Sequence, residues 1–152
     1  MRYLSLALLF ITSSVFAAGE IAVCNSPLTG YSYHPFDSAS KPSTFTPDKV
    51  TNSKITVRIT GTSSIDVLYT DSSQSIKSAT QEGAKVVLLQ VGSRDFTLGV
   101  FYPGSLTTIY IFSKKGDENT VAMHLARAGD EVKYPKSTLL VGSCELIVIP
   151  KS

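Results

Sequence analysis

Residues 55–60 have the sequence ITVRIT and residues 65–70 the sequence IDVLYT, and these two short segments decide the fold class. In the first segment, Ile55, Val57 and Ile59 alternate with polar side chains. A period of two is typical of a strand that buries one face. Gly61 separates the two segments, and Asp71 closes the second, as turn residues do. The pattern therefore predicts two consecutive strands.

The same pattern continues along most of the chain. Further strands are expected at residues 76–81, 86–91, 96–102, 106–113, 121–126 and 139–149. The polar segment 76–81 is expected near a sheet edge. Segment 86–91 is apolar on both faces, which favours a central strand. Gly99 and Gly142 interrupt their strands, and each is a candidate bulge, with a close backbone approach as the alternative at Gly99.

Turn signals punctuate these segments about every ten residues, which favours an antiparallel meander. Glu82-Gly83 predicts a tight turn, and Pro103-Gly104 has the chemistry of a type II turn. We therefore predict an all-β, single-domain protein that forms a small barrel or a sandwich. Strand alternation alone does not separate these two architectures.

The first 17 residues predict a secretory signal peptide. Arg2 precedes an apolar run from Leu4 to Ile11, and Val15-Phe16-Ala17 has the small residues that a cleavage site needs. Cleavage near Ala17 would leave residues 18–152 as one β-domain in the periplasm or outside the cell. No later segment approaches the roughly 20 apolar residues of a transmembrane helix.

The charge balance excludes one broad class of partner. The chain has 14 Lys and Arg against 12 Asp and Glu, so the loss of Arg2 with the leader would leave a formal charge of +1. A near-neutral balance argues against a surface dedicated to nucleic acid or to anionic membranes. We therefore expect no nucleic-acid partner.

The two cysteines, Cys24 and Cys144, are expected to form a disulfide between the first and the last strand. An exported protein meets an oxidising compartment, and an even number of cysteines indicates pairing. A loop of this size would contribute about 4–5 kcal/mol in the chain-entropy model. Lipidation of Cys24 is the weaker alternative, because Val23 rather than a small residue precedes it.

Tyr31, Tyr33 and His34 are the candidate binding residues. In an extended chain the two tyrosines point to one side and His34 to the other. Residues 37–52 are rich in Ser, Thr, Pro and Lys, which predicts a long surface loop, a kind of segment that often carries function. Aromatic residues beside such a loop suit recognition of a partner. Ordinary strand packing is the alternative for these three side chains.

No motif indicates catalysis or a metal site. His34 and His124 lie far apart and have no neighbours at ligand spacing, whereas zinc needs three or four donors. The sequence lacks a Gly-x-Ser-x-Gly elbow, and its glycines are spaced as turns rather than as a phosphate loop. We therefore expect that the protein binds no cofactor and no metal and is not an enzyme. The minor alternative is a hydrolase that uses His124 or His34.

The order of features resembles that of a family of small exported bacterial proteins of unknown function. The features are Cys24, Gly30, Tyr31, Tyr33, residues 65–71, residues 82–86, Tyr110 to Phe112, Lys136-Ser137 and Cys144. Such proteins would carry Asp-Gly where this chain has Glu82-Gly83. The resemblance implies a periplasmic or secreted protein, and it transfers no activity and no catalytic residue.

The chain is more weakly similar to periplasmic lysozyme inhibitors, which are also small β-proteins tied by a disulfide. Their Ser-Gly-x-x-Tyr loop is missing, and Thr29-Gly30-Tyr31 echoes it only in part. The function expected from the sequence is thus an exported, non-enzymatic β-domain that binds a protein or a small ligand. The alternatives are an inhibitor of this kind or a lipocalin-like carrier of apolar ligands. A carrier needs an open interior, which requires that the interior is not filled by Phe96, Leu98, Tyr110 and Phe112.

Overall fold

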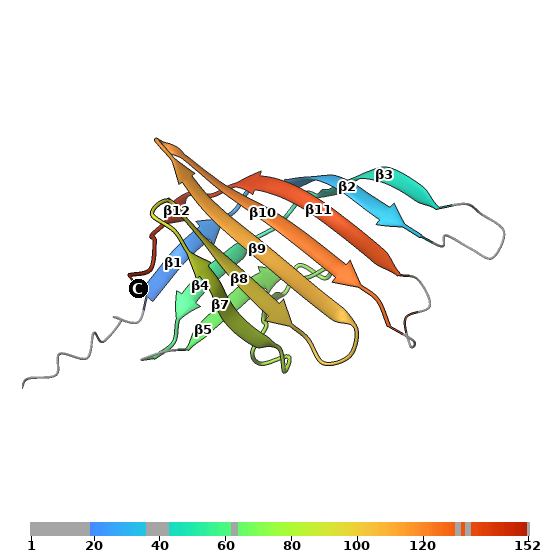
Figure 1. Cartoon of the computed structure of the whole chain (residues 1–152), viewed down its shortest axis with the longest axis horizontal. Coiled ribbons are helices and arrows are strands. Elements are labelled where there is room, and N and C mark those ends of the chain that lie inside the picture. Colours follow the sequence, from blue (N-terminus) through green and yellow to red (C-terminus); the bar gives the residue numbers. More distant parts are fainter. Residues whose placement is uncertain (1–18, 36–42, 62–63, 130–131, 133–134, 152) are drawn as a thin grey trace, which may run out of the picture.

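The computed structural model describes residues 19–35, 43–61, 64–129, 132 and 135–151. All its regular elements are strands, and they form two antiparallel sheets (Figure 1). The predicted signal peptide, residues 1–17, lies outside the described residues, as do residues 36–42 of the predicted loop.

The smaller sheet has the strand order β12-β1-β4-β5-β6. Its strands are β1 (Gly19–Cys24), β4 (Ile55–Ile59), β5 (Ile65–Thr70), β6 (Ile76–Ser78) and β12 (Leu146–Ile147). Segments 55–60 and 65–70 pair as β4 and β5, with Val57 opposite Val67. The polar segment lies at the edge as β6, which confirms that prediction.

The larger sheet has the strand order β3-β2-β11-β10-β9-β8-β7. Its strands are β2 (Leu28–His34), β3 (Thr44–Val50), β7 (Lys85–Val91), β8 (Asp95–Phe101), β9 (Leu106–Lys115), β10 (Glu118–Arg127) and β11 (Lys136–Ser143). Strands β7 to β11 are a meander, and the β2–β3 hairpin extends this sheet at its other end (Figure 1).

The two sheets pack as a sandwich and do not close, so the barrel alternative is wrong. The core lies between them, where alternate residues of each strand are buried. Phe96 and Phe112 are fully buried and stack with ring centroids 4.8 Å apart. Val57 and Val67 face them from the smaller sheet and are equally buried. The period-two pattern of the sequence thus places one face of each sheet in the core.

The predicted disulfide is present and joins Cys24, the last residue of β1, to Cys144. Cys144 lies where the chain leaves β11 of the larger sheet for β12 of the smaller one. The last predicted strand, 139–149, is therefore two strands, because its two halves belong to different sheets. The disulfide holds the point at which the chain crosses between them.

Three local predictions are wrong. Strand β7 lies at an edge of its sheet rather than in the centre, with Leu88 and Leu89 exposed. The expected loop 37–52 contains strand β3, because its polar residues suffice for an edge strand paired on one side only. Gly142 is no bulge: it pairs in regular register with Val121, and its missing Cβ makes room for the side chain of Leu28.

Gly99 also pairs in regular register. A Cβ there would lie 2.7 Å from the ring of Phe101, which folds over the glycine on the outer side of the sheet. The bulge in this region lies in the partner strand β7, where the register shifts between Leu88 and Gln90.

Candidate functional site

Exposed apolar side chains gather on the outer face of the larger sheet. Strand register places Tyr31 opposite Leu139 on one side and Pro47 on the other, and it places Tyr33 opposite Phe45. We define the apolar face as the outward side chains of Tyr31, Tyr33, Phe45, Ile111, Leu139 and Val141, all of which are exposed. Phe45, at 67%, and Leu139, at 55%, are the most accessible.

The two aromatic rings at the end of this face are held in place by each other. Tyr31 and Phe45 stack with ring centroids 5.1 Å apart and planes inclined by 6°. The two residues lie on adjacent strands of the β2–β3 hairpin, two residues out of direct register. Diagonal neighbours of this kind are within reach of aromatic side chains. The stack therefore presents a rigid aromatic surface to solvent.

A glycine sets the position of strand β2. Gly30 lies so close to β11 that an added Cβ would lie 2.0 Å from the carbonyl oxygen of Leu139. No side chain fits there without a shift of the backbone. Gly30 thus brings Tyr31 next to Leu139 and makes the apolar face continuous between the two strands.

A polar cluster lies on the opposite face of the same hairpin. Asp48 accepts hydrogen bonds from the ammonium of Lys136, at 2.8 Å, and from the hydroxyl of Ser32. Thr138 lies 2.7 Å from the same hydroxyl, and both hydroxyl residues are buried. The bond from Lys136, followed by that from Ser32, lowers the pKa of Asp48 to about 2. The cluster fastens β3 to β2 and β11.

The structure separates the predicted binding residues. Tyr31 and Tyr33 belong to the apolar face, whereas His34 lies on the side of Ser32 and is half-buried. The other histidine, His124, pairs with Leu139 in β11 and so shares the outer face with Tyr31. Its Nε2 lies 3.0 Å from the hydroxyl of Ser137. The two histidines therefore face opposite sides of one sheet and cannot act in one site.

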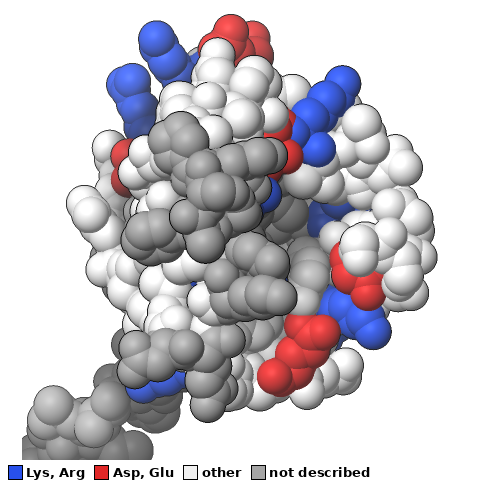
Figure 2. Space-filling view, turned by 90° about the vertical axis from the view of Figure 1, so that its right-hand side faces the viewer, with Lys and Arg blue, Asp and Glu red and all other residues white. Residues whose placement is uncertain are grey.

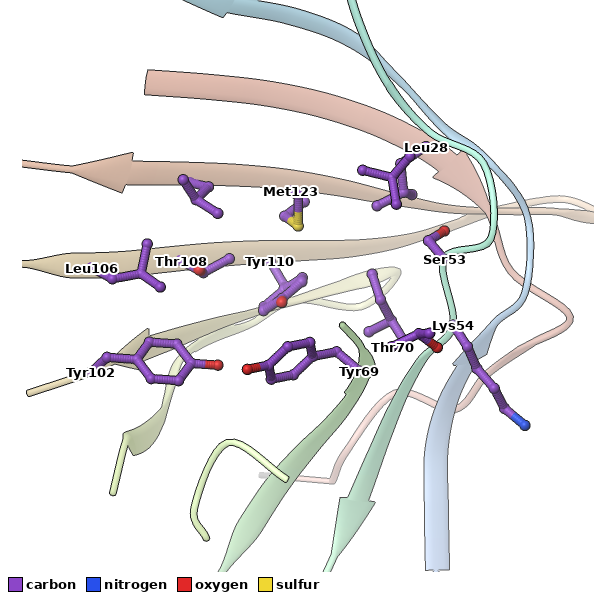
Figure 3. A pocket seen from close by; sticks show the side chains of 13 residues that line it. Leu28, Ser53, Lys54, Tyr69, Thr70, Tyr102, Leu106, Thr108, Tyr110 and Met123 are labelled. Atoms are coloured by element: carbon purple, nitrogen blue, oxygen red, sulfur yellow. The ribbon is translucent and has the colours of Figure 1, made fainter. Parts of the chain in front are cut away.

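A cavity of about 180 Å³ lies between the two sheets (Figure 3). Its walls are mostly apolar and come from both sheets, and they include Leu28, Val50, Ile55, Leu106, Met123 and Leu125. The fully buried ring of Phe96 and its neighbours fill the rest of the interior. The chain therefore has a small, partly open cavity beside a packed core, not the large interior of a lipocalin-like barrel.

Three tyrosines bring polar groups to this cavity. The hydroxyls of Tyr69 and Tyr102 point toward each other, and Tyr110 lies above Tyr69 in the view of Figure 3. The Tyr69 hydroxyl donates to the carboxylate of Glu82. Burial raises the pKa of all three tyrosines, and the bond to Glu82 raises that of Tyr69 further. All three are therefore neutral hydroxyls at physiological pH.

Charged side chains form no field of one sign at the end of the molecule that Figure 2 shows. Lys, Arg, Asp and Glu are interspersed there among uncharged residues. The ion pair of Arg58 with Asp66 joins the neighbouring strands β4 and β5, whereas that of Lys136 with Asp48 reaches from β11 across β2 to β3. Among the described residues, no group of three or more His, Cys, Asp or Glu side chains could hold a metal ion.

Sequence reasoning did not find most of this site. Phe45 lay in a predicted loop, and Leu139 and Val141 were expected only as part of a strand. Their exposure could not be predicted, because the alternating pattern does not tell which face of a strand is the outer one when both faces carry apolar residues. The cavity tyrosines could not be told from core residues, since each occupies a position of the alternating set that is expected to face the interior.

Comparison of the chain with protein-family models, with curated proteins and with solved structures finds no match. The described residues contain no helix of the length and apolarity that crossing a membrane requires.

Proposed function

We propose that this chain is an exported, non-catalytic binding domain that holds a partner protein on its apolar face. The observation that carries the proposal is the continuity of this face across β3, β2 and β11. Single exposed apolar residues are common on protein surfaces, whereas contiguous ones mark interaction sites. Removal of this apolar surface from water would favour association, against the entropy that the two proteins lose on binding.

The chemistry of the face favours a protein over other partners. Tyrosine and phenylalanine are enriched at protein interfaces. A stack such as that of Tyr31 on Phe45 is ordered before binding, which reduces the entropy lost on association. The side of the molecule that Figure 2 shows carries mixed charges and offers no basic track for nucleic acid.

The arrangement of polar groups supports a non-catalytic role. His124 and Ser137 approach each other, but on a flat and exposed sheet face rather than in a cleft. In a catalytic pair a third group orients the histidine. No carboxylate among the described residues bonds to His124. A hydrolase remains the minor alternative, and loss of any measured turnover in His124→Ala would support it.

Two observations support export. The predicted leader precedes the domain, and the Cys24–Cys144 disulfide suits an oxidising compartment. If the partner protein is an enzyme, the chain would act as an inhibitor, which is the alternative that the weaker similarity to lysozyme inhibitors implies.

A capture experiment tests the proposal. The oxidised chain without residues 1–17 is immobilised and exposed to an extract of the producing cell's envelope. The matched variants are the pair Tyr31→Ala with Phe45→Ala and, as a control, Ile76→Ala, whose side chain is 60% exposed on the other sheet. We expect one protein in stoichiometric amount on the wild type and the control, and at least about tenfold less on the double variant.

Equal capture by all three proteins, or no capture at all, would contradict the proposal. Sedimentation of the purified chain gives the second readout. A dimer that the double variant dissociates would make the occupant a second copy of the chain, which also contradicts a distinct partner.

A further inference from the structure

We propose that the cavity between the two sheets binds a small uncharged molecule with an apolar ring and one hydrogen-bonding oxygen, of about the size of a substituted phenol. This site is independent of the apolar face. The cavity lies on the inner side of the sheets, and none of the six residues of the apolar face lines it.

The size of the cavity limits the ligand. An apolar cavity of about 150 Å³ accommodates a single benzene ring. At about 180 Å³, this cavity exceeds that volume by the space of one or two further atoms. A long acyl chain would not fit, which sets the site apart from a lipid carrier.

The walls of the cavity favour an apolar body. Leu28, Leu106 and Met123 contribute aliphatic and thioether surface to its lining. The thioether of Met123 suits an aromatic ligand, because sulfur makes favourable contacts with ring edges.

The tyrosine hydroxyls give the ligand its polar requirement. Tyr110 is 95% buried, with only 5% of its surface exposed, and it lines the cavity. None of the hydrogen bonds found among the described residues involves its hydroxyl. A ligand oxygen at this end of the cavity would gain a hydrogen bond from a tyrosine hydroxyl. The hydroxyls of Tyr69 and Tyr102 lie at the same end of the cavity (Figure 3).

Charge at the site excludes an acidic ligand. The carboxylate of Glu82 accepts from Tyr69 at the polar end of the cavity, and it would repel a second carboxylate. The side chain of Lys54 extends away from the cavity in Figure 3, so it does not offset that repulsion. The ligand oxygen is therefore a hydroxyl or a carbonyl.

The methionines of the chain provide a direct readout. The chain has two, Met1 and Met123, and only Met123 lines the cavity. Selective ¹³C labelling of methionine methyl groups gives a signal that Met123→Leu assigns. The probes are p-cresol, toluene, which has the same shape without the oxygen, and hexanoate, which is an anion.

We expect p-cresol to shift the Met123 signal saturably and to bind more tightly than toluene or hexanoate. Tyr102→Phe removes one hydroxyl oxygen. It should weaken the binding of p-cresol about fivefold and leave the binding of toluene unchanged, since one hydrogen bond changes an affinity by about a factor of five. Leu106→Phe should fill the cavity and abolish the shift. Leu89→Phe, on the exposed edge strand, is its control.

Several results would overturn the proposal. No saturable shift up to about 10 mM p-cresol would do so, as would an unchanged shift in a folded Leu106→Phe protein. Tighter binding of hexanoate would exclude an uncharged ligand. Equal loss of p-cresol and toluene in Tyr102→Phe would exclude the assigned polar contact. The comparison of p-cresol with toluene in Tyr102→Phe still tests the proposal if Leu106→Phe does not fold.

Discussion

At the scale of single residues, two side chains decide the geometry of the β2–β3 hairpin. Gly30 allows the close approach to Leu139, and Asp48 collects hydrogen bonds from Ser32 and Lys136. Neither role is visible in the sequence. From the sequence, Gly30 is only one feature of a resemblance, and Asp48 falls in a predicted loop. Both depend on which strand lies beside β2, and local pattern does not give strand order.

The ionisation of Asp48 makes the hairpin sensitive to acid. Because its folded pKa of about 2 lies below the ordinary value of 3.8, the ionised carboxylate stabilises the fold above about pH 4. This contribution is lost as the pH falls toward 2. It should be on the order of 1 kcal/mol, since the pair is partly exposed and screened by solvent.

Urea unfolding of the wild type and of Asp48→Asn measures this contribution. The difference in the free energy of unfolding should be largest at pH 5 and should shrink toward zero near pH 2. Other carboxylates titrate in both proteins, so their effects cancel. A difference that stays constant with pH would show that Asp48 does not stabilise the fold through its charge.

At the scale of elements, the alternating pattern predicted most strands, and the errors lie where tertiary context decides. β4, β5, β8, β9 and β10 follow the pattern because each buries one face against the other sheet. The apolar segment 86–91 was placed centrally, yet β7 is an edge strand. A short apolar run reports neither how many neighbours a strand has nor whether all its side chains are buried, since Leu88 and Leu89 of β7 are exposed.

The short edge strand β6 is held by one carboxylate. Asp66 of β5 is buried and accepts from the hydroxyl of Ser78, at 2.8 Å, and from the backbone of Thr80, at 3.2 Å. Burial raises the pKa of Asp66, but these bonds and the one from Arg58 outweigh it, so the net pKa is lowered. Asp66→Ala should cost about 2–3 kcal/mol, because it leaves buried donors without an acceptor.

Hydrogen exchange locates this loss. Amides of residues 76–84 should exchange much faster in Asp66→Ala, while those of β9 and β10 change only with global stability. Glu118→Gln, at an exposed carboxylate, is the control. Unchanged exchange in residues 76–84 would mean that strand pairing alone holds β6.

At the scale of the whole molecule, the sequence predicted the class of fold and the disulfide, and only part of the candidate site. Tyr31 and Tyr33 were chosen correctly as neighbours on one face. Their continuation onto Leu139 and Phe45 follows from the placement of the β2–β3 hairpin at the free end of the larger sheet (Figure 1). The disulfide ties the crossing between the sheets and so keeps the sandwich closed at that end.

The central claim is that the apolar face holds a partner protein, and photo-crosslinking in the producing cell tests it most directly. A photoreactive phenylalanine analogue is placed at position 31 in one variant and at position 76, on the other sheet, in a second. The account predicts one discrete protein adduct from position 31 and none from position 76. No adduct from position 31, or the same adducts in equal yield from both positions, would contradict it.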